Sequence, residues 1–406
     1  MSLEGPHRQR GSMPACELRG RNRTSAHATP QESTRGPSMK LALVVHDFDP
    51  GYGQGRYCLE IARRLSGRIP VEIHSNTWNA GVLPGVEWRR VPAWRLNAAT
   101  TIASFLPFAE RSLRRHPATL VHAQGLSCWS ADIVTAHICN AARRRHLAGS
   151  PLKTRILTSC ITPLERAFYL HQHRANLIAV SAVVRREIET HYGWDGPVSV
   201  IHHGTDTERF RPVDSATERD TARARYDLPT GAWTWLFVGE AVKGLRETLQ
   251  QMPAFPTARL LVITRSARGE YEALARRLGV ADRVFLRGPE TKLELAYRAA
   301  DVFVYPAGYD SFALVAAEAM ASGLPVVLGK PIGAAELVDN GQNGLLCNPL
   351  DPKSLQTHLS WIHSNPEAAR QMGRAARCTL QRHTWVECIE ATWDVYRMAA
   401  ASRSSS

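Results

Sequence analysis

Residues 302–327, VFVYPAGYDSFALVAAEAMASGLPVV, decide the fold of this chain. The apolar run Val302–Tyr305 is typical of a buried strand, and Phe312–Ala321 has the composition and length of a helix. Asp310 or Ser311 stands between them, where the N-cap of that helix is expected. A further strand is predicted at Pro325–Val327. This order of strand, turn, helix and strand predicts a parallel sheet with a crossover helix.

The same alternation extends along most of the chain. The second half contains further strand patterns at Trp235–Gly239, Leu260–Thr264 and Val284–Leu286. The first half contains them at Leu41–His46, Val71–His74, Leu120–Ala123, Leu177–Val180 and Val198–Ile201. Helical spacing between the strands, as in Tyr57–Leu65, places helices on both faces of each sheet. The predicted fold class is therefore α/β, with two Rossmann-like, doubly wound parallel-sheet domains facing each other across a cleft.

The length of 406 residues also favours two domains, because one hydrophobic core rarely organises so long a chain. Residues 1–38 are rich in Gly, Pro, Ser, Thr and Arg, and we predict a disordered extension there. We predict the first domain at 39–204 and the second at 205–385. Residues 386–406 are predicted to form a C-terminal helix that packs back toward the first domain and frays at its end.

The net charge of +13 is unevenly distributed. Residues 39–204 hold 20 basic and 11 acidic side chains, a net of +9, whereas residues 205–406 hold 24 and 23, a net of +1. No apolar run reaches the roughly 18 residues of a membrane-spanning helix. The start has no apolar signal core, so we expect a cytoplasmic protein.

Two glycine-containing turns join predicted strands to helices, one in each domain. The first is GYGQGR at 51–56, where glycine permits a tight turn and the helix start presents N–H groups to an anion. A turn that merely needs positive φ is the alternative. The second is VGEAVKG at 238–244, where Lys243 is either a phosphate-binding cation or a solvated surface lysine. Glu318 follows Asp310 by about two helical turns in an apolar helix, which favours a functional carboxylate over a surface one.

Taken together, these segments resemble glycosyltransferase family 4, the retaining nucleotide-sugar transferases of GT-B architecture, and in particular its bacterial lipopolysaccharide-core and glycolipid members. The segment from Asp310 to Pro325 is similar to the family's Glu-x7-Glu motif with its trailing Ala-Met-Ala-x-Gly-Leu-Pro. Residues 201–212, IHHGTDTERFRP, resemble its interdomain signature. Gly53–Tyr57 resembles its N-terminal glycine loop, and residues 333–338, GAAELV, another recurrent segment. The resemblance runs from Lys40 to about Ala399.

The resemblance implies a set of site residues. Asp310 would face the donor sugar, Lys243 would neutralise the departing diphosphate, and His137 would lie near the acceptor. Glu318 would hold the nucleotide ribose. The implied donor-binding residues also include the backbone amides of Phe312, Ala313 and Leu314, the loop at Arg287 and Gly288 beside the base, and Gly53 and Gly55 over the phosphates. The nucleotide sugar is a substrate, and neither a cofactor nor a metal is implied. Asp47-Phe48-Asp49 formally matches a metal-binding Asp-x-Asp, but it adjoins the first strand of the non-donor domain.

Two departures from the family pattern bear on catalysis. Asp310 is one methylene shorter than the usual Glu, and Glu240 stands where many members have an Arg. A carboxylate beside a diphosphate is repulsive, so a catalytically weak nucleotide-sugar-binding pseudoenzyme is the alternative to an active transferase. Arg246 or Arg265 is a candidate to compensate.

A basic stretch follows His137. Arg143, Arg144, Arg145, Lys153 and Arg155 occur without an intervening acid, and residues 105–116, FLPFAERSLRRH, form a second basic stretch. These stretches predict a surface for an anionic membrane or a lipid-linked acceptor, with a solvated basic face as the alternative. Basic residues interleaved with stacking aromatics are missing from the sequence, so nucleic acid is not an expected partner.

The sequence thus predicts a metal-independent, retaining hexosyltransferase that uses a nucleotide-diphosphate sugar. Its acceptor is predicted to be a glycan or glycolipid of cell-envelope or lipopolysaccharide synthesis. We expect it in the cytoplasm, peripherally on the inner face of the plasma membrane.

Overall fold

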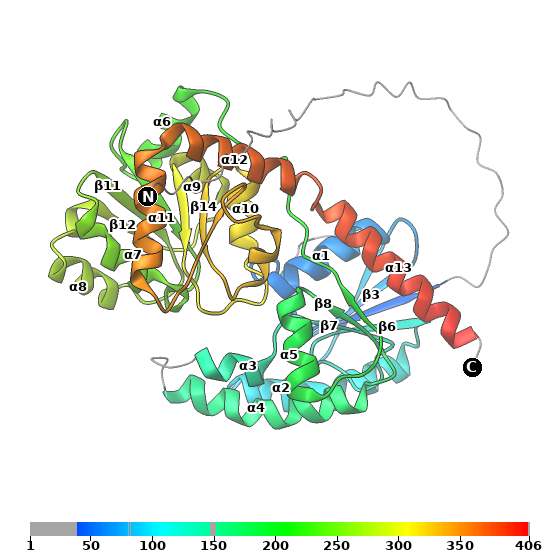
Figure 1. Ribbon diagram of the computed structural model, residues 1–406. Coiled ribbons are helices and arrows are strands. Elements are labelled where there is room, and N and C mark those ends of the chain that lie inside the picture. Colours follow the sequence, from blue (N-terminus) through cyan, green and yellow to red (C-terminus); the bar gives the residue numbers. More distant parts are fainter. Residues whose placement is uncertain (1–38, 80, 82, 147–151, 405–406) are drawn as a thin grey trace, which may run out of the picture. The chain divides into compact units, whose positions relative to one another are not determined.

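The computed structural model describes residues 39–79, 81, 83–146 and 152–404, which form two parallel sheets with helices around them (Figure 1). The predicted disordered extension at 1–38 lies outside the described residues. Every strand pairing within the two sheets is parallel. The predicted α/β architecture with two parallel sheets is therefore confirmed.

The first sheet has seven strands in the order β5-β3-β1-β6-β7-β8-β9. They are β1 (Leu41–Val44), β3 (Val71–Ser75), β5 (Val86–Arg90), β6 (Leu120–Gln124), β7 (Ile133–Ala136), β8 (Asn176–Ala179) and β9 (Val198–Val200). Its helices are α1 (Gly53–Leu65), α2 (Ala98–Arg115), α3 (Asn140–Arg143), α4 (Leu152–His171) and α5 (Ala182–Tyr192). The short strands β2 (Asp47–Phe48) and β4 (Thr77–Trp78) pair beside it.

Alternation along β1 shows why both faces of this sheet are covered. Leu41 and Leu43 pack into one apolar cluster, and Ala42 and Val44 pack into another. Successive side chains of a strand point to opposite faces, so a wholly apolar strand needs helices on both sides.

The second sheet has six strands in the order β12-β11-β10-β13-β14-β15. They are β10 (Trp233–Val238), β11 (Ala258–Ile263), β12 (Val284–Arg287), β13 (Val302–Tyr305), β14 (Val326–Gly329) and β15 (Leu345–Cys347). Its helices are α6 (Ala216–Arg225), α7 (Leu245–Gln251), α8 (Gly269–Arg277), α9 (Glu294–Ala299), α10 (Leu314–Ala321), α11 (Pro352–Ser364) and α12 (Pro366–Leu380).

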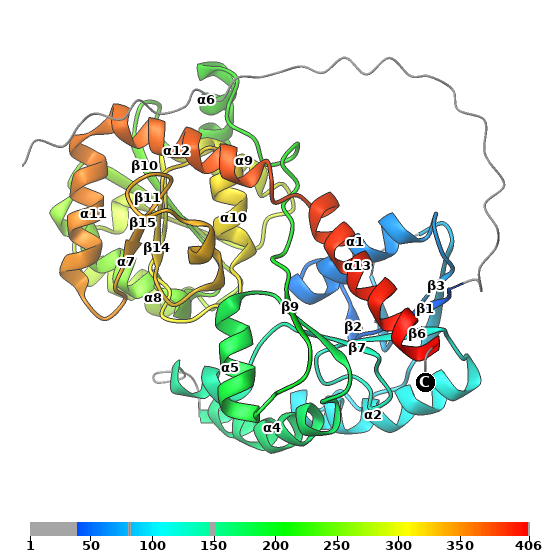
Figure 2. The ribbon, with the colours of Figure 1, turned by 45° about the vertical axis from the view of Figure 1, so that its right-hand side comes forward.

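The last helix, α13 (Trp385–Ser404), runs beside α1 and packs on the first sheet (Figures 1 and 2). The hydroxyl of Tyr396 lies 2.7 Å from Nδ1 of His122 on β6, and Arg403 forms an ion pair with Asp132. No helix among the described residues is both long and apolar enough to cross a membrane.

Candidate active site

The turn between β13 and α10 is organised by the carboxylate of Asp310. Its Oδ1 accepts hydrogen bonds from the backbone amides of Phe312 at 3.3 Å and Ala313 at 3.0 Å. Helix α10 begins at Leu314, two residues later than the sequence predicts, because Ala313 adopts the left-handed conformation with φ of 70°. The amides of Phe312 and Ala313 are thus taken by Asp310, and the amide of Leu314 is the first with no hydrogen-bond partner among the described residues.

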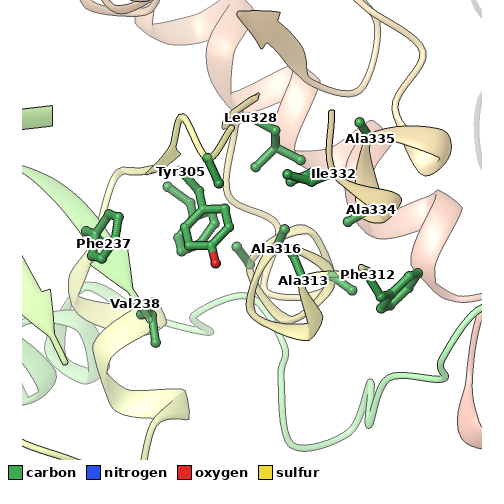
Figure 3. Packing of buried hydrophobic residues seen from close by; sticks show 14 of the residues in the cluster. Phe237, Val238, Tyr305, Phe312, Ala313, Ala316, Leu328, Ile332, Ala334 and Ala335 are labelled. Atoms are coloured by element: carbon green, nitrogen blue, oxygen red, sulfur yellow. The ribbon is translucent and has the colours of Figure 1, made fainter. Parts of the chain in front are cut away.

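The other oxygen of Asp310 joins this turn to the second glycine turn. Oδ2 of Asp310 lies 2.8 Å from Nζ of Lys243 and accepts a hydrogen bond from the hydroxyl of Tyr305 at 2.9 Å. Burial alone would lower the pKa of Lys243, but the Asp310 carboxylate outweighs it and raises that pKa. The Tyr305 ring is held between Phe237 of β10 and the alanines at the start of α10 (Figure 3). Lys243 and Asp310 are therefore a fixed, charged pair.

Glu318 lies about one turn into α10 and is partly buried. Its Oε2 accepts a hydrogen bond of 2.9 Å from the hydroxyl of Tyr297, which also donates to the carbonyl of Val315. Burial raises the pKa of Glu318 to about 7, and the Tyr297 hydrogen bond, together with the charges of Arg209 and Arg56, opposes the rise. Oε1 has no hydrogen-bond partner among the described residues, so one carboxylate oxygen is available to a ligand hydroxyl.

The glycine turn of the first half lies against this helix start. A Cβ added to Gly53 would come within 3.5 Å of Cδ1 of Leu314. A Cβ added to Gly55 would lie 2.0 Å from the carbonyl oxygen of Asp49, which no side chain can occupy. Gly55 is therefore needed for the turn itself, and Gly53 faces the second half.

His137 belongs to a compact group of rings between the two halves. Its Nε2 lies 2.8 Å from Oε1 of Gln124, and its ring stacks on His203 with centroids 5.4 Å apart. His203 in turn contacts the edge of Phe312 at 5.5 Å. Burial, followed by the neighbouring His203, lowers the pKa of His137 well below its usual value. The neutral imidazole of His137 is thus separated from Phe312, in the Asp310 turn, by the ring of His203.

Four hydrogen bonds join the halves on the side of α5. The carboxylate of Glu336 accepts hydrogen bonds of 2.9 Å from the amides of Ala182 and Val183 at the start of α5. The hydroxyl of Ser181 donates to the carbonyl of Ser311 at 2.7 Å. The hydroxyl of Tyr309 donates to Glu187 at 3.1 Å. The turn that carries Asp310 is thus anchored on the first half.

Arg287 and Gly288 follow the edge strand β12. Arg287 forms an ion pair of 2.7 Å with Asp227 and donates to the carbonyl of Tyr226. Gly288 has open space around it. The side-chain hydrogen bonds of Arg287 go to Leu286, Tyr226 and Asp227, so no described contact joins this loop to Glu318 or Lys243.

The basic residues after His137 separate into two groups. Arg143, the last residue of α3, is half-buried, and its positive charge opposes the rise that Asp310 causes in the pKa of Lys243. The next turn packs on the second half, because the His146 ring stacks on Tyr309 at 5.1 Å. The other four, Arg144, Arg145, Lys153 and Arg155, are exposed.

Two of the partners described above escaped the sequence prediction: Tyr297 positions Glu318, and Gln124 positions His137. Arg265, which the sequence offers as a candidate to compensate for Glu240, reaches the first glycine turn. No local pattern marks Tyr297 or Gln124, since each meets its partner only through the fold. Within the described part of the chain, no three His, Cys, Asp or Glu side chains gather as a metal site requires.

Comparisons with known proteins agree with this geometry. Residues 52–209 match the family model described as Glycosyltransferase Family 4, and residues 218–379 match Glycosyl transferases group 1. A D-inositol 3-phosphate glycosyltransferase from Streptomyces scabiei is 33% identical over 90% of this chain and 92% of its own length. The chain belongs to glycosyltransferase family 4.

Solved structures support the same fold for this family 4 chain. WaaG, a glycosyltransferase involved in lipopolysaccharide biosynthesis, superposes with a TM-score of 0.73 at 18% identity, covering 87% of this chain and 99% of WaaG. Anabaena Alr3699/HepE, solved in complex with UDP-glucose, superposes with a TM-score of 0.67 at 16% identity, covering 91% and 100%. The predicted GT-B fold and the family resemblance are therefore confirmed. At 16–18% identity the solved structures support the fold and nothing more specific.

Proposed function

We propose that this family 4 glycosyltransferase moves a hexose, with retention and without a metal ion, from a nucleotide-diphosphate sugar to an anionic or lipid-linked acceptor. The observation that carries this proposal is the start of α10. There the turn carries the paired Asp310 and Lys243, the free amide of Leu314 and the open oxygen of Glu318, and Leu314 lies against the first glycine turn.

Each of these groups has a role that its chemistry suits. The Glu318 carboxylate accepts hydrogen bonds from the ribose diol, while the Leu314 amide and Lys243 bind the diphosphate. Charge develops on the diphosphate as it leaves, so fixed positive groups stabilise that transition state. With retention, the acceptor attacks from the leaving-group face and a phosphate oxygen takes its proton. Neutral His137 donates or accepts a hydrogen bond at the acceptor hydroxyl.

UDP-glucose is the first donor to test, because HepE is described in complex with it. A thermal-shift panel of UDP-, GDP- and ADP-sugars should show at least one that raises the melting temperature. Glu318→Ala should abolish that shift, whereas Glu367→Ala, on the exposed surface of α12, should preserve it. If no donor stabilises the wild-type protein, the proposed function is wrong.

The acceptor side of the proposal rests on the exposed surface of α4. Leu152, Ile156 and Leu170 are 67%, 54% and 51% exposed along one side of this helix. Hollows of about 370 and 440 Å³ beside them are lined by Arg144, Arg155 and Arg166. An apolar stripe flanked by cations suits an anionic lipid surface, where each basic residue contributes about 1 kcal/mol.

Flotation of the protein with liposomes tests the membrane surface. We expect binding to phosphatidylglycerol vesicles and none to phosphatidylcholine vesicles. Changing Arg144, Arg155 and Arg166 to Ser should abolish flotation, whereas changing Arg370 and Arg374 on α12 to Ser should leave it unchanged. Equal flotation of both variants would exclude α4 as the docking surface.

One observation favours the pseudoenzyme alternative. The only lysine of the second glycine turn is already paired with Asp310, and Glu240 adds another negative charge to that turn. Under this alternative the donor binds and is slowly hydrolysed, and no sugar reaches any acceptor. Sugar transfer to an acceptor in a membrane extract, followed with radiolabelled donor, would exclude it.

A further inference from the structure

The charge balance of the second glycine turn does not suit a diphosphate by itself. Lys243 is its one cation, and the carboxylates of Asp310 and Glu240 both act on Lys243. One positive and two negative groups give this turn a formal charge of −1, and the charge of Arg143 from the first half, which also acts on Lys243, only brings the balance to zero. A departing diphosphate needs fixed positive charge nearby, so a further cation would favour an active site.

Arg265 stands immediately beside that turn. It follows β11, and the hydroxyl of the next residue, Ser266, accepts a hydrogen bond of 3.0 Å from the amide of Ala241. Thr264, on the other side, is buried and accepts a hydrogen bond from the Ser266 amide at 3.1 Å. The backbone that carries Arg265 is thus fixed against the segment from Glu240 to Lys243.

The side chain of Arg265 reaches across to the glycine turn of the first half. Its Nη2 donates a hydrogen bond of 3.0 Å to the carbonyl of Gly51, and its guanidinium lies 4.6 Å from the centroid of the Tyr52 ring. A Cβ added to Gly51 would approach Nη2 to 3.2 Å. Two residues further on, Gly53 faces the start of α10. Arg265 therefore reaches from the second half to the glycine turn whose Gly53 faces the start of α10.

Among the described residues no carboxylate lies within ion-pair distance of Arg265; the nearby Asp49 carboxylate accepts a hydrogen bond from the Gly51 amide, and its Oδ1 and Arg265 Nη2 lie 3.1 and 3.2 Å from the position of a Cβ on Gly51. The other candidate to compensate for Glu240, Arg246, is paired with Glu270. A guanidinium has five N–H donors in a planar fork, and the Gly51 carbonyl uses one of those of Arg265. The remaining donors match the paired oxygens of a phosphate.

We propose that Arg265 binds the diphosphate of the donor and supplies the cation that Glu240 removes from the family pattern. This inference rests on the proposed function, since it names a further residue of the same site. The Arg265 guanidinium comes from the second half and is held by the first glycine turn. It thus places a positive charge near the proposed position of the diphosphate beside Gly53. Nucleoside diphosphates should therefore depend on Arg265 much more than the corresponding monophosphates.

Isothermal titration of wild-type protein with UDP, GDP and ADP identifies the diphosphate that binds, and the matching monophosphate is then titrated. In Arg265→Gln the Kd of the diphosphate should rise about 10- to 100-fold, as for loss of a charged hydrogen bond. The Kd of the monophosphate should change less than about threefold. Arg265→Lys should recover part of the loss, because the charge returns without the fork.

Arg276→Gln, on the exposed surface of α8, is the matched control and should bind both nucleotides like the wild type. An equal loss of diphosphate and monophosphate affinity in Arg265→Gln would show that Arg265 only holds the glycine turn, and unchanged affinities would show that it has no role; either result overturns the inference. If the wild type binds none of the three diphosphates, the proposed function itself fails, which is a distinct outcome.

Discussion

The glycine turn at residues 51–56, which leads from β2 into the first turn of α1, and the turn between β13 and α10 lie against each other, yet they achieve a close approach differently. The first contains three glycines, Gly51, Gly53 and Gly55, and contributes space and backbone. The second ends in Ala313 at positive φ and is held by the side chain of Asp310. The first turn is thus shaped by missing side chains, and the second carries the charged groups.

The largest expected effect comes from filling the first turn. Gly55→Ala places a methyl group 2.0 Å from a backbone carbonyl that cannot move cheaply, so we expect a loss of at least about 3 kcal/mol in the free energy of unfolding. Gly67→Ala, with no atom within 4 Å of the added methyl, should change it by less than about 0.5 kcal/mol. Urea denaturation of both variants measures the contrast. Similar losses of unfolding free energy in the two variants would mean that the backbone around Gly55 relaxes and that glycine is not needed there.

A smaller effect is expected on sugar-nucleotide affinity, which should depend on pH through Glu318 of α10, whereas the first turn contributes no titrating group to it. The pKa of Glu318 is raised to about 7, so its carboxylate is mostly ionised at pH 8 and mostly protonated at pH 6. Only the ionised form accepts two hydrogen bonds from a diol, so the affinity for UDP-glucose, or for the sugar nucleotide that binds, should fall about tenfold from pH 8 to pH 6.

Glu318→Gln is the control for this titration and should bind weakly with little dependence on pH. The sign for stability is opposite to that for binding. The folded state of the wild type holds the Glu318 proton more tightly than the unfolded state, so its stability falls as pH rises from about 4.5 to 7. The Gln variant should lack the part of that fall due to Glu318, whereas the parts due to Glu165 and Glu187, whose pKa values burial also raises to about 7, should remain. A wild-type affinity that rises toward pH 6 would contradict the assignment of Glu318 to the ribose.

Local features of the fold and the site can be predicted from the sequence, whereas features that depend on tertiary contacts cannot. Strands, helices and the carboxylates at 310 and 318 follow from periodicity and motif spacing, because those features are local. The start of α10 was predicted two residues early, since nothing in the sequence marks Ala313 for positive φ. The separation of Arg143 from its basic neighbours arises from packing of the turn at His146 on Tyr309, residues 163 positions apart. Such contacts depend on the tertiary fold and not on local pattern.

The smallest effect tests why the second turn does without a glycine. An L-residue in the left-handed region costs about 1–2 kcal/mol, so Ala313→Gly relieves strain at φ of 70°. It also removes a methyl group that is buried, which costs about 0.8 kcal/mol. We expect a net gain of about 0.5 kcal/mol in the free energy of unfolding. Ala316→Gly, inside α10, should instead lose about 1 kcal/mol or more, because glycine disfavours a helix interior. If Ala313→Gly is destabilised as much as Ala316→Gly, packing of the Ala313 methyl group outweighs the backbone strain. The turn between β13 and α10 would then need a side chain at residue 313, whereas the first turn needs glycine at residue 55.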